Sequence, residues 1–311
     1  MNKKMPGIPE SAQTEEKARE FLEATLWPNG PVCPHCKETN VYKMTHRVGS
    51  AYSSRKGMYR CHGCGKKFTV TVGTIFEGSH IPLHKWLMAV HFITASKKGF
   101  SAHQLHRMIG VTYKSAWFMC HRIRYSMKQD PIKTKLRGKV EVDETYMGGK
   151  NKNRPLSPRF REGAKRKVPV VALVSRSGKV RSFPVERVGG EQLKGAIREN
   201  VRKDATIYTD RWYAYTGIGQ EYKGGHHTVN HSALQYARPG GIHTNTVESY
   251  FSLLKRGVMG TFHHVSKRHL ARYCDEFAFR WNHKKVSDTE RAIAAIKGTE
   301  GKRLMYKQPG C

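Results

Sequence analysis

Acidic residues are scarce in this chain of 311 residues, because 24 Asp and Glu stand against 56 Lys and Arg. The formal net charge at pH 7 is +32, and the basic residues recur along the whole length. Such an excess of positive charge attracts polyanions. The composition therefore predicts a nucleic-acid partner, DNA or RNA.

Long apolar runs are also missing. No segment approaches the roughly 18 consecutive apolar residues that a membrane-spanning helix requires. The N-terminal segment MNKKMPGIPESAQTEEKARE has basic residues but no apolar stretch after them, so it does not resemble a secretory signal. We therefore expect no membrane partner and a cytoplasmic, nucleoid-associated protein.

The length is sufficient for two or three domains, and 38% apolar residues can form a sizeable core in at least one of them. We expect five segments, divided where composition and periodicity change. They are an N-terminal helical segment (1–28), a small β unit with paired cysteines (29–80), a helical module (81–130), an α/β domain (138–285) and a C-terminal tail (286–311).

Four of the seven cysteines form two CxxC pairs, Cys33 with Cys36 and Cys61 with Cys64. The pairs are 24 residues apart, and Gly, Thr, Tyr and β-branched residues between and after them favour short strands. This spacing is typical of a zinc ribbon that holds one tetrahedral Zn²⁺ ion. The alternative is four buried cysteines without a metal.

Two helices joined by a tight turn are predicted between Ser101 and Met127, in the segments SAHQLHRMIG and VTYKSAWFMCHRIR, with Ser101 and Thr112 as their N-caps. They have the form of a helix-turn-helix, with an apolar stripe through Cys120 facing inward. The side chains expected nearer to solvent, and therefore to DNA, include Tyr113, Lys114, Arg122 and Arg124. The alternative is an ordinary helical bundle with a solvated face.

The rest of the chain predicts an α/β fold. Strand-like segments VEVDETYM, VPVVALV, KVRSFPVE and ATIYTD are interrupted by a helical segment, and helices follow Thr244. The segment GGKNKNRPLSPRFREGAKRK, between the first two strands, is predicted to be a mobile basic loop in which Lys150 and Lys152 contact DNA.

Carboxylates interrupt this basic sequence at informative positions. Asp143 shares strand parity with Glu141 and Thr145, whereas the valines on either side of Glu141 have the opposite parity and face the core. Asp210 ends an apolar strand. Carboxylates in such places can converge at one edge of a sheet. Glu141 and Glu144 are interpreted as supporting or surface residues.

A third polar group lies on the helix after Thr244. Its apolar stripe leaves another face to Asn245, Glu248, Ser252 and Lys255, with Glu248 and Lys255 about two turns apart. Together with Asp143 and Asp210, this face predicts a site for two divalent ions, Mg²⁺ or Mn²⁺, that supports in-line displacement at a phosphodiester. Lys255 would neutralise a DNA phosphate.

With these residues in place, the chain resembles bacterial insertion-sequence transposases that couple an N-terminal zinc ribbon to an RNase H-like DDE domain. The resemblance runs from about Trp27 to Asn282. It is carried by CPHC with CHGCGKKF, GTIFEGSHIPLHKW, VEVDETYMGGK, IYTDRWYAY, and the long segment from HTNTVESYFSLLKRG to EFAFRWN.

The resemblance implies a mixed sheet flanked by helices, cleavage at terminal inverted repeats, and attack of the freed 3′-hydroxyl on target DNA with Mg²⁺. It assigns Asp143 and Asp210 as the first two acids. Glu248 with Lys255 fits the usual Glu and Lys pairing, whereas related groups with asparagine in third place would favour Asn245. Synapsis of two element ends implies a homo-oligomer on double-stranded DNA.

Two other functions remain open at this point. A structure-selective nuclease or resolvase would use the same metal chemistry but stop at hydrolysis. A non-enzymatic DNA-binding regulator would retain the fold without metal-dependent nicking. A serine or tyrosine recombinase is disfavoured, because no clustered arginines surround a nucleophile.

Overall fold

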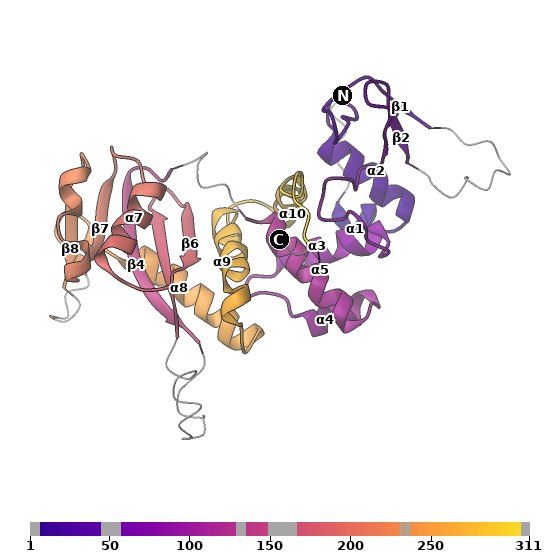
Figure 1. The fold of residues 1–311 in the computed structure, drawn as a ribbon. Coiled ribbons are helices and arrows are strands. Elements are labelled where there is room, and N and C mark those ends of the chain that lie inside the picture. Colours follow the sequence, from indigo (N-terminus) through magenta and orange to yellow (C-terminus); the bar gives the residue numbers. More distant parts are fainter. Residues whose placement is uncertain are drawn as a thin grey trace. The chain divides into compact units, whose positions relative to one another are not determined.

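The computed structural model describes residues 7–44, 57–128, 135–148, 167–230, 233 and 237–305 (Figure 1). The chain forms two compact units, of which one combines residues 1–127 with residues 285–311 and the other spans residues 128–284. No helix within the described ranges is long and apolar enough to cross a membrane.

The first unit contains a three-stranded antiparallel sheet and six helices among its described residues. The order of the strands in the sheet is β1-β2-β3. The elements in chain order are α1 (Ile8–Ser11), α2 (Glu15–Leu26), β1 (Val41–Lys43), β2 (Tyr59–Cys61), β3 (Lys67–Phe68), α3 (Leu83–Ala95), α4 (Ala102–Ile109), α5 (Tyr113–Ser126) and α10 (Asp288–Lys297).

The two predicted helix starts at Ser101 and Thr112 are confirmed. The hydroxyl of Ser101 accepts a hydrogen bond from the amide of Gln104, and that of Thr112 accepts one from the amide of Ser115. Gly110, between the helices, adopts the left-handed conformation with φ = 61°, which an L side chain rarely tolerates. This glycine therefore allows the tight turn that brings α4 against α5.

The C-terminal segment is more than the expected tail. Helix α10 begins with a capping box at Ser287 and Glu290, and it packs against α3 and α2. Ala292, Ala295 and Ile296 are buried. The segment after residue 285 therefore completes the core of the first unit, because α2 and α3 leave an apolar surface that needs a further helix.

The second unit is built on the predicted RNase H-like mixed sheet, with strand order β6-β5-β4-β7-β8. The first three strands pair antiparallel, and β7 and β8 run parallel to β4. The elements of this unit are β4 (Lys139–Met147), β5 (Val168–Ser175), β6 (Val180–Pro184), α7 (Gly190–Asn200), β7 (Thr206–Asp210), η2 (Tyr213–Tyr215), η3 (Ile218–Glu221), β8 (His226–Val229), β9 (Ala237–Arg238), β10 (Ile242–His243), α8 (Asn245–Arg256), the π-helical turn η5 (Gly257–Thr261) and α9 (Lys267–Asn282).

Helices cover both faces of this sheet (Figure 1). One face carries Val140 and Val142 and packs with α7 and the turns after β7. The other face packs on the apolar stripes of α8 and α9, and the stripe of α9 includes the buried Cys274. Because side chains alternate along β4, Asp143 belongs to the face of α8. The fold thereby brings Asp143 to the side of the sheet from which α8 presents its polar residues.

Candidate functional site

The four paired cysteines form a cluster whose sulfur atoms all lie within 4.8 Å of one another. Cys33 Sγ is 3.7 Å from Cys64 Sγ, and Cys36 Sγ is 3.5 Å from Cys61 Sγ. Four sulfurs at about 2.3 Å from one tetrahedral Zn²⁺ would be roughly 3.8 Å apart. The cluster therefore has the dimensions and the donor set of a structural zinc site.

Both cysteine pairs use the same backbone turn. The amide of Lys37 donates to the carbonyl of Cys33 at 2.9 Å, and the amide of Gly65 donates to that of Cys61 at 3.0 Å. Lys37 and Gly65 are both left-handed, with φ of 65° and 68°. Glycine adopts this conformation freely, whereas lysine does so at a cost in free energy. Burial raises the pKa of Cys33, but hydrogen bonds to its sulfur outweigh this effect and lower the pKa to about 7.

The first two acids of the α/β unit lie on neighbouring parallel strands. Asp143 lies within β4, and Asp210 is the last residue of β7. The register pairs Val140 with Ile207, so the position level with Asp143 is Asp210. Each carboxylate also fixes its local backbone, because Asp143 Oδ1 accepts from the amide of Glu144 at 2.8 Å and Asp210 Oδ1 accepts from the amide of Trp212 at 3.2 Å.

Electrostatics connect these acids with the third segment. The pKa of Asp143 is raised to about 7 by burial, and the charges of Glu144, Asp210 and Glu248 raise it further. An amide hydrogen bond from Glu144 opposes the increase. A carboxyl group in this environment retains its proton near neutral pH until a cation or a donor compensates its charge. A site of this kind favours a bound cation.

Helix α8 supplies the remaining predicted residues. Glu248 and Asn245 are exposed in its first turn, and Lys255 is exposed in its last turn. Glu248 Oε1 accepts a hydrogen bond from Thr244 Oγ1 at 3.1 Å. Glu248 is the α8 residue whose charge raises the pKa of Asp143.

The three carboxylates are not gathered as tightly as the thiols. Among the described residues, the cysteine cluster is the one group of three or more Cys, His, Asp or Glu side chains arranged closely enough to hold a metal ion. Asp143, Asp210 and Glu248, called the acidic cluster below, do not form such a group. A two-metal site does not require such a group, because one shared carboxylate can lie between ions about 4 Å apart while the other acids bind one ion each.

Glu141 has a role that its sequence position did not reveal. The side chain is fully buried, and Oε2 accepts hydrogen bonds from the amides of Thr246 at 2.8 Å and Val247 at 3.0 Å. These amides belong to the first turn of α8, whose N-terminal N–H groups and dipole favour a negative charge. Glu141 therefore fixes the start of α8, two residues before Glu248, to the strand that carries Asp143.

Arg176 completes this attachment. Its Nε donates to Glu141 Oε1 at 2.7 Å, while its two terminal nitrogens donate to the carbonyls of Gly241 at 2.7 Å and His243 at 2.8 Å. The guanidinium lies 4.4 Å from the ring centre of Tyr208. One arginine thus connects β4, β7 and the segment that leads into α8. The sequence did indicate the face of β4 on which Glu141 lies, because Glu141 has the same strand parity as Asp143.

Glu144 lies on the opposite face of β4 from Asp143. Its Oε2 accepts a hydrogen bond from Tyr215 Oη at 2.7 Å. Burial raises the pKa of Glu144, the hydrogen bond from Tyr215 opposes this, and the charge of Asp210 adds to it. Glu144 is therefore a partly buried carboxylate rather than a surface residue, and from the other face of β4 its charge raises the pKa of Asp143.

The helical pair has a narrower exposed face than predicted. Tyr113 and Lys114 are exposed at the start of α5, as expected, but Arg122 and Arg124 are buried, with exposed fractions of 5% and 2%. The prediction that these two arginines face solvent is wrong. Helix α5 is covered by α3, α4 and α10.

Arg122 shows how a buried guanidinium is accommodated here. Its Nη2 donates to the carbonyl of Glu77 at 2.6 Å, and the guanidinium lies 5.5 Å from the rings of Trp86 and Phe118. The side chain therefore links α5 to the segment before α3. Lys150 and Lys152, predicted to contact DNA, lie outside the described residues.

Comparisons with known proteins agree with this arrangement. Residues 135–282 match the family model of the ISXO2-like transposase domain, and residues 13–67 match that of the transposase zinc-ribbon domain. A protein from Halobacterium salinarum, described as an uncharacterized protein in transposable element ISH50, is 30% identical over 278 residues. The similarity covers 86% of this chain and 90% of that protein.

Proposed function

Because the chain belongs to the family of insertion-sequence transposases that join a zinc ribbon to an ISXO2-like transposase domain, we propose that it cleaves DNA at the ends of its element and joins the freed 3′-hydroxyl to target DNA. The observation that carries this proposal is the placement of Asp143 and Asp210 at level positions of two adjacent strands, with Glu248 on the helix that Glu141 attaches to the first of them. Acids placed in this way fit divalent cations.

Asp143, Asp210 and Glu248 are proposed to hold Mg²⁺ or Mn²⁺, with Asn245 as an additional or substitute oxygen donor. Bound in such a site, divalent ions activate an attacking hydroxyl and stabilise the leaving oxygen of a phosphodiester. Glu141 and Arg176 hold the first turn of α8 beside β4, so that Glu248 remains on the same side as Asp143. Lys255, about two turns along α8, is proposed to contact a phosphate of the bound DNA.

The four cysteines are proposed to hold one Zn²⁺ ion that maintains the small core around Tyr59 and Phe68. The helical pair is proposed to contact DNA through Tyr113 and Lys114, and the segment with Lys150 and Lys152 is proposed to add basic contacts. Arg122 and Arg124 are no longer assigned to DNA, since their guanidinium groups are buried. Action on two element ends requires a homo-oligomer on double-stranded DNA.

The test is a strand-cleavage assay on the DNA that flanks the gene, with Mg²⁺, comparing the wild type with Asp143→Asn. We expect at least a thousandfold loss of cleavage with DNA binding retained, since removal of one metal-binding acid disables the whole site. Asp204→Asn is the matched control, because Asp204 is exposed and pairs with Arg202 at 3.0 Å, before β7 begins.

The products distinguish the rival functions. Joining of the cleaved end to a second DNA supports transposition, whereas cleavage without joining would indicate a nuclease or resolvase. Equal cleavage by the wild type and Asp143→Asn would remove Asp143 from the site. No metal-dependent cleavage by the wild type would indicate a DNA-binding regulator.

A further inference from the structure

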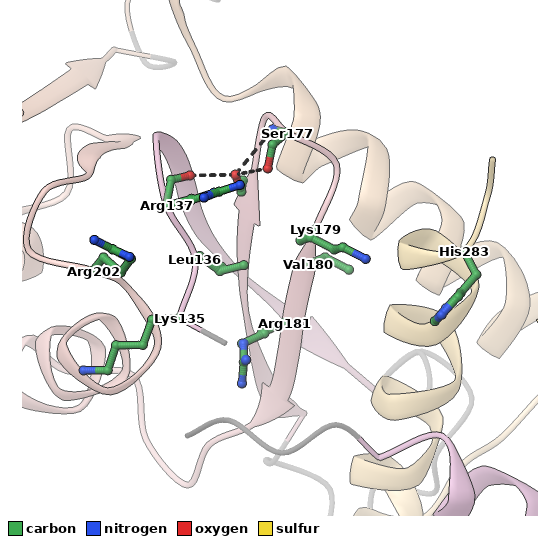
Figure 2. Close-up of a pocket in the computed structure, with 10 residues that line it drawn as sticks. Lys135, Leu136, Arg137, Ser177, Lys179, Val180, Arg181, Arg202 and His283 are labelled. Atoms are coloured by element: carbon green, nitrogen blue, oxygen red, sulfur yellow. Dashed lines mark hydrogen bonds between the residues drawn. The ribbon is translucent and has the colours of Figure 1, made fainter. Parts of the chain in front are cut away.

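A second feature of the α/β unit is a basic pocket of about 690 Å³, which Figure 2 shows in close-up. It lies where the chain enters β4, beside the turn between β5 and β6. Five of its ten lining residues are Lys or Arg, and none is Asp or Glu. The cationic residues are Lys135, Arg137, Lys179, Arg181 and Arg202.

The backbone holds these side chains around one opening. Leu136 forms a parallel bridge with Val201, which places Lys135 and Arg137 beside Arg202. Ser175 Oγ donates to the carbonyl of Arg137 at 2.8 Å and lies 2.8 Å from Ser177 Oγ (Figure 2). This contact fixes the β5–β6 turn against the start of β4. The cations thus come from three segments that the sheet itself keeps together.

Two of the five pocket cations, Arg137 and Lys179, are exposed. Within the part of the chain that the structure describes, the side chains of these two residues make no hydrogen bond or ion pair. Lys135 Nζ donates to a backbone carbonyl, that of Arg198, at 2.9 Å. Arg202 pairs with Asp204. Concave sites lined by charges of one sign concentrate the field and attract counter-ions.

The pocket is separate from the acidic cluster. Arg137 precedes β4, six residues before Asp143, which corresponds to roughly 20 Å along an extended strand. Leu136 pairs with Val201, which precedes β7, whereas Asp210 is the last residue of β7. The pocket and Asp210 therefore lie toward opposite ends of that strand. Phosphates of one DNA strand recur about every 3.4 Å along the helix axis. A duplex bound at the acids can therefore reach the pocket with a phosphate about six nucleotides away.

We propose that this pocket, with Arg137 and Lys179 at its opening, is a binding site for the phosphodiester backbone of DNA, distinct from the site of strand cleavage. Guanidinium and ammonium groups both suit phosphate oxygens, and Ser177 offers a neutral donor beside them. This inference rests on the proposed function for its choice of DNA. It does not require that the acids cleave DNA, because backbone contacts contribute to affinity independently of catalysis.

The experiment measures the affinity of the full chain for a random-sequence 30-base-pair duplex by fluorescence anisotropy over a range of salt concentrations. The double variant Arg137→Gln with Lys179→Gln is compared with the double variant Lys223→Gln with Arg268→Gln, which removes two exposed charges of the same unit outside the pocket. If each pocket cation neutralises one phosphate, the slope of log K against log salt becomes shallower by about 1.8. The control pair is expected to change the slope by less than half as much.

Lys179→Glu provides a second measurement, since reversal of one exposed charge is expected to weaken DNA binding at least tenfold without lowering the thermal unfolding temperature. Equal slopes for the pocket and control variants would overturn the proposal. Inorganic phosphate is also titrated at constant ionic strength. The proposal would be overturned if phosphate inhibited DNA binding to a saturating level while the pocket variants left the slope of log K against log salt unchanged, because that outcome indicates a site for small anions.

Cleavage separates this inference from the proposed function. Strand cleavage by the control variant Lys223→Gln with Arg268→Gln is expected to match that of the wild type, whereas the pocket variant requires a higher DNA concentration for half-maximal cleavage. A wild type that binds DNA through the pocket but never cleaves would contradict the proposed function alone. A wild type that cleaves, with a slope unchanged in the pocket variant, would contradict this inference alone.

Discussion

Among the described residues, the thiols of Cys33, Cys36, Cys61 and Cys64 form a group close enough to hold one metal ion, whereas the carboxylates of Asp143, Asp210 and Glu248 do not form such a group. The cysteines lie in two hydrogen-bonded turns of one small sheet. The acids come from two strands and a helix that are far apart in sequence, and they repel one another when ionised. Backbone hydrogen bonds between residues close in the chain therefore bring the cysteines together, whereas the positions of the acids depend on packing between distant elements.

The largest effect is expected where the cysteine cluster is broken. Cys61→Ala removes one of four thiolates, and the core that depends on them contains few buried residues. We expect loss of bound zinc and destabilisation of the ribbon by more than about 5 kcal/mol. Zinc content after gel filtration and thermal unfolding measure this change.

Cys120→Ala is the matched control, because Cys120 is also fully buried but lies on α5 outside the cluster. It should retain zinc and lose about 1 kcal/mol or less. Full zinc content in Cys61→Ala would show that the four sulfurs do not act as one ligand set.

Glu141 is predicted to position the acids, as the two hydrogen-bonded turns position the cysteines. Glu141→Gln removes the charge that accepts from Arg176 and from two amides of α8. We expect destabilisation by about 2 to 4 kcal/mol, since Arg176 loses its buried counter-charge. We also expect a several-fold higher Mg²⁺ concentration for half-maximal cleavage, because Glu248 is less firmly placed.

Glu186→Gln removes an exposed carboxylate from the same unit and should change neither property. A stability loss in Glu141→Gln with an unaltered Mg²⁺ requirement would limit Glu141 to folding. Urea unfolding and cleavage at graded Mg²⁺ concentrations separate the two results.

Burial of Asp143, together with the charges of the neighbouring acids, predicts that the stability of the α/β unit depends on pH. The pKa of Asp143 is about 7 in the folded chain and 3.8 ordinarily, so between these values the folded state binds more protons than the unfolded state. Stability therefore falls as pH rises from about 4 to 7. In Mg²⁺-free buffer, Asp143→Asn should be more stable than the wild type by about 2 to 4 kcal/mol at pH 8, and by less near pH 5.

Urea unfolding at pH 5, 6.5 and 8 measures this difference, without chelators, since these would remove zinc. Addition of Mg²⁺ should narrow the gap at pH 8, because the ions compensate the charges of the wild type. A wild type that equals Asp143→Asn in stability at pH 8 would contradict the coupling of the acids.

The smallest effect is expected within the turns of the cysteine cluster. Lys37 adopts a left-handed conformation where the second turn has Gly65. Lys37→Gly should stabilise the zinc-bound ribbon by about 0.5 kcal/mol, since the relief of strain exceeds the entropy lost by glycine. Lys37→Ala keeps a Cβ atom and should not stabilise, and an equal gain in both variants would exclude the backbone explanation. Thermal unfolding with saturating zinc provides the measurement.

The sequence predicted local features better than distant ones. The CxxC spacing predicted the cysteine cluster, and Ser101 and Thr112 were correctly predicted as helix starts, because these features depend on residues close in the chain. The predicted exposure of Arg122 and Arg124 was wrong, because burial on α5 depends on elements packed against it, such as the segment of Glu77 and Trp86 that contacts Arg122.

The arrangement of the acids could be predicted only in part. Strand parity correctly placed Asp143 on the face opposite Val142, and the mixed sheet was correctly expected. The attachment of α8 through Glu141 could not be predicted, because hydrogen bonds between β4 and residues 246 and 247 depend on the three-dimensional path of the chain. The basic pocket likewise depends on pairing between Leu136 and Val201.

The most direct measurement is a Mn²⁺ titration of the full chain followed by electron paramagnetic resonance. The account predicts about two Mn²⁺ ions bound per wild-type chain at the acids, their loss in Asp143→Asn, and their retention in Asp204→Asn. Equal Mn²⁺ binding by the wild type and Asp143→Asn would contradict the assignment of the acidic cluster as the metal site.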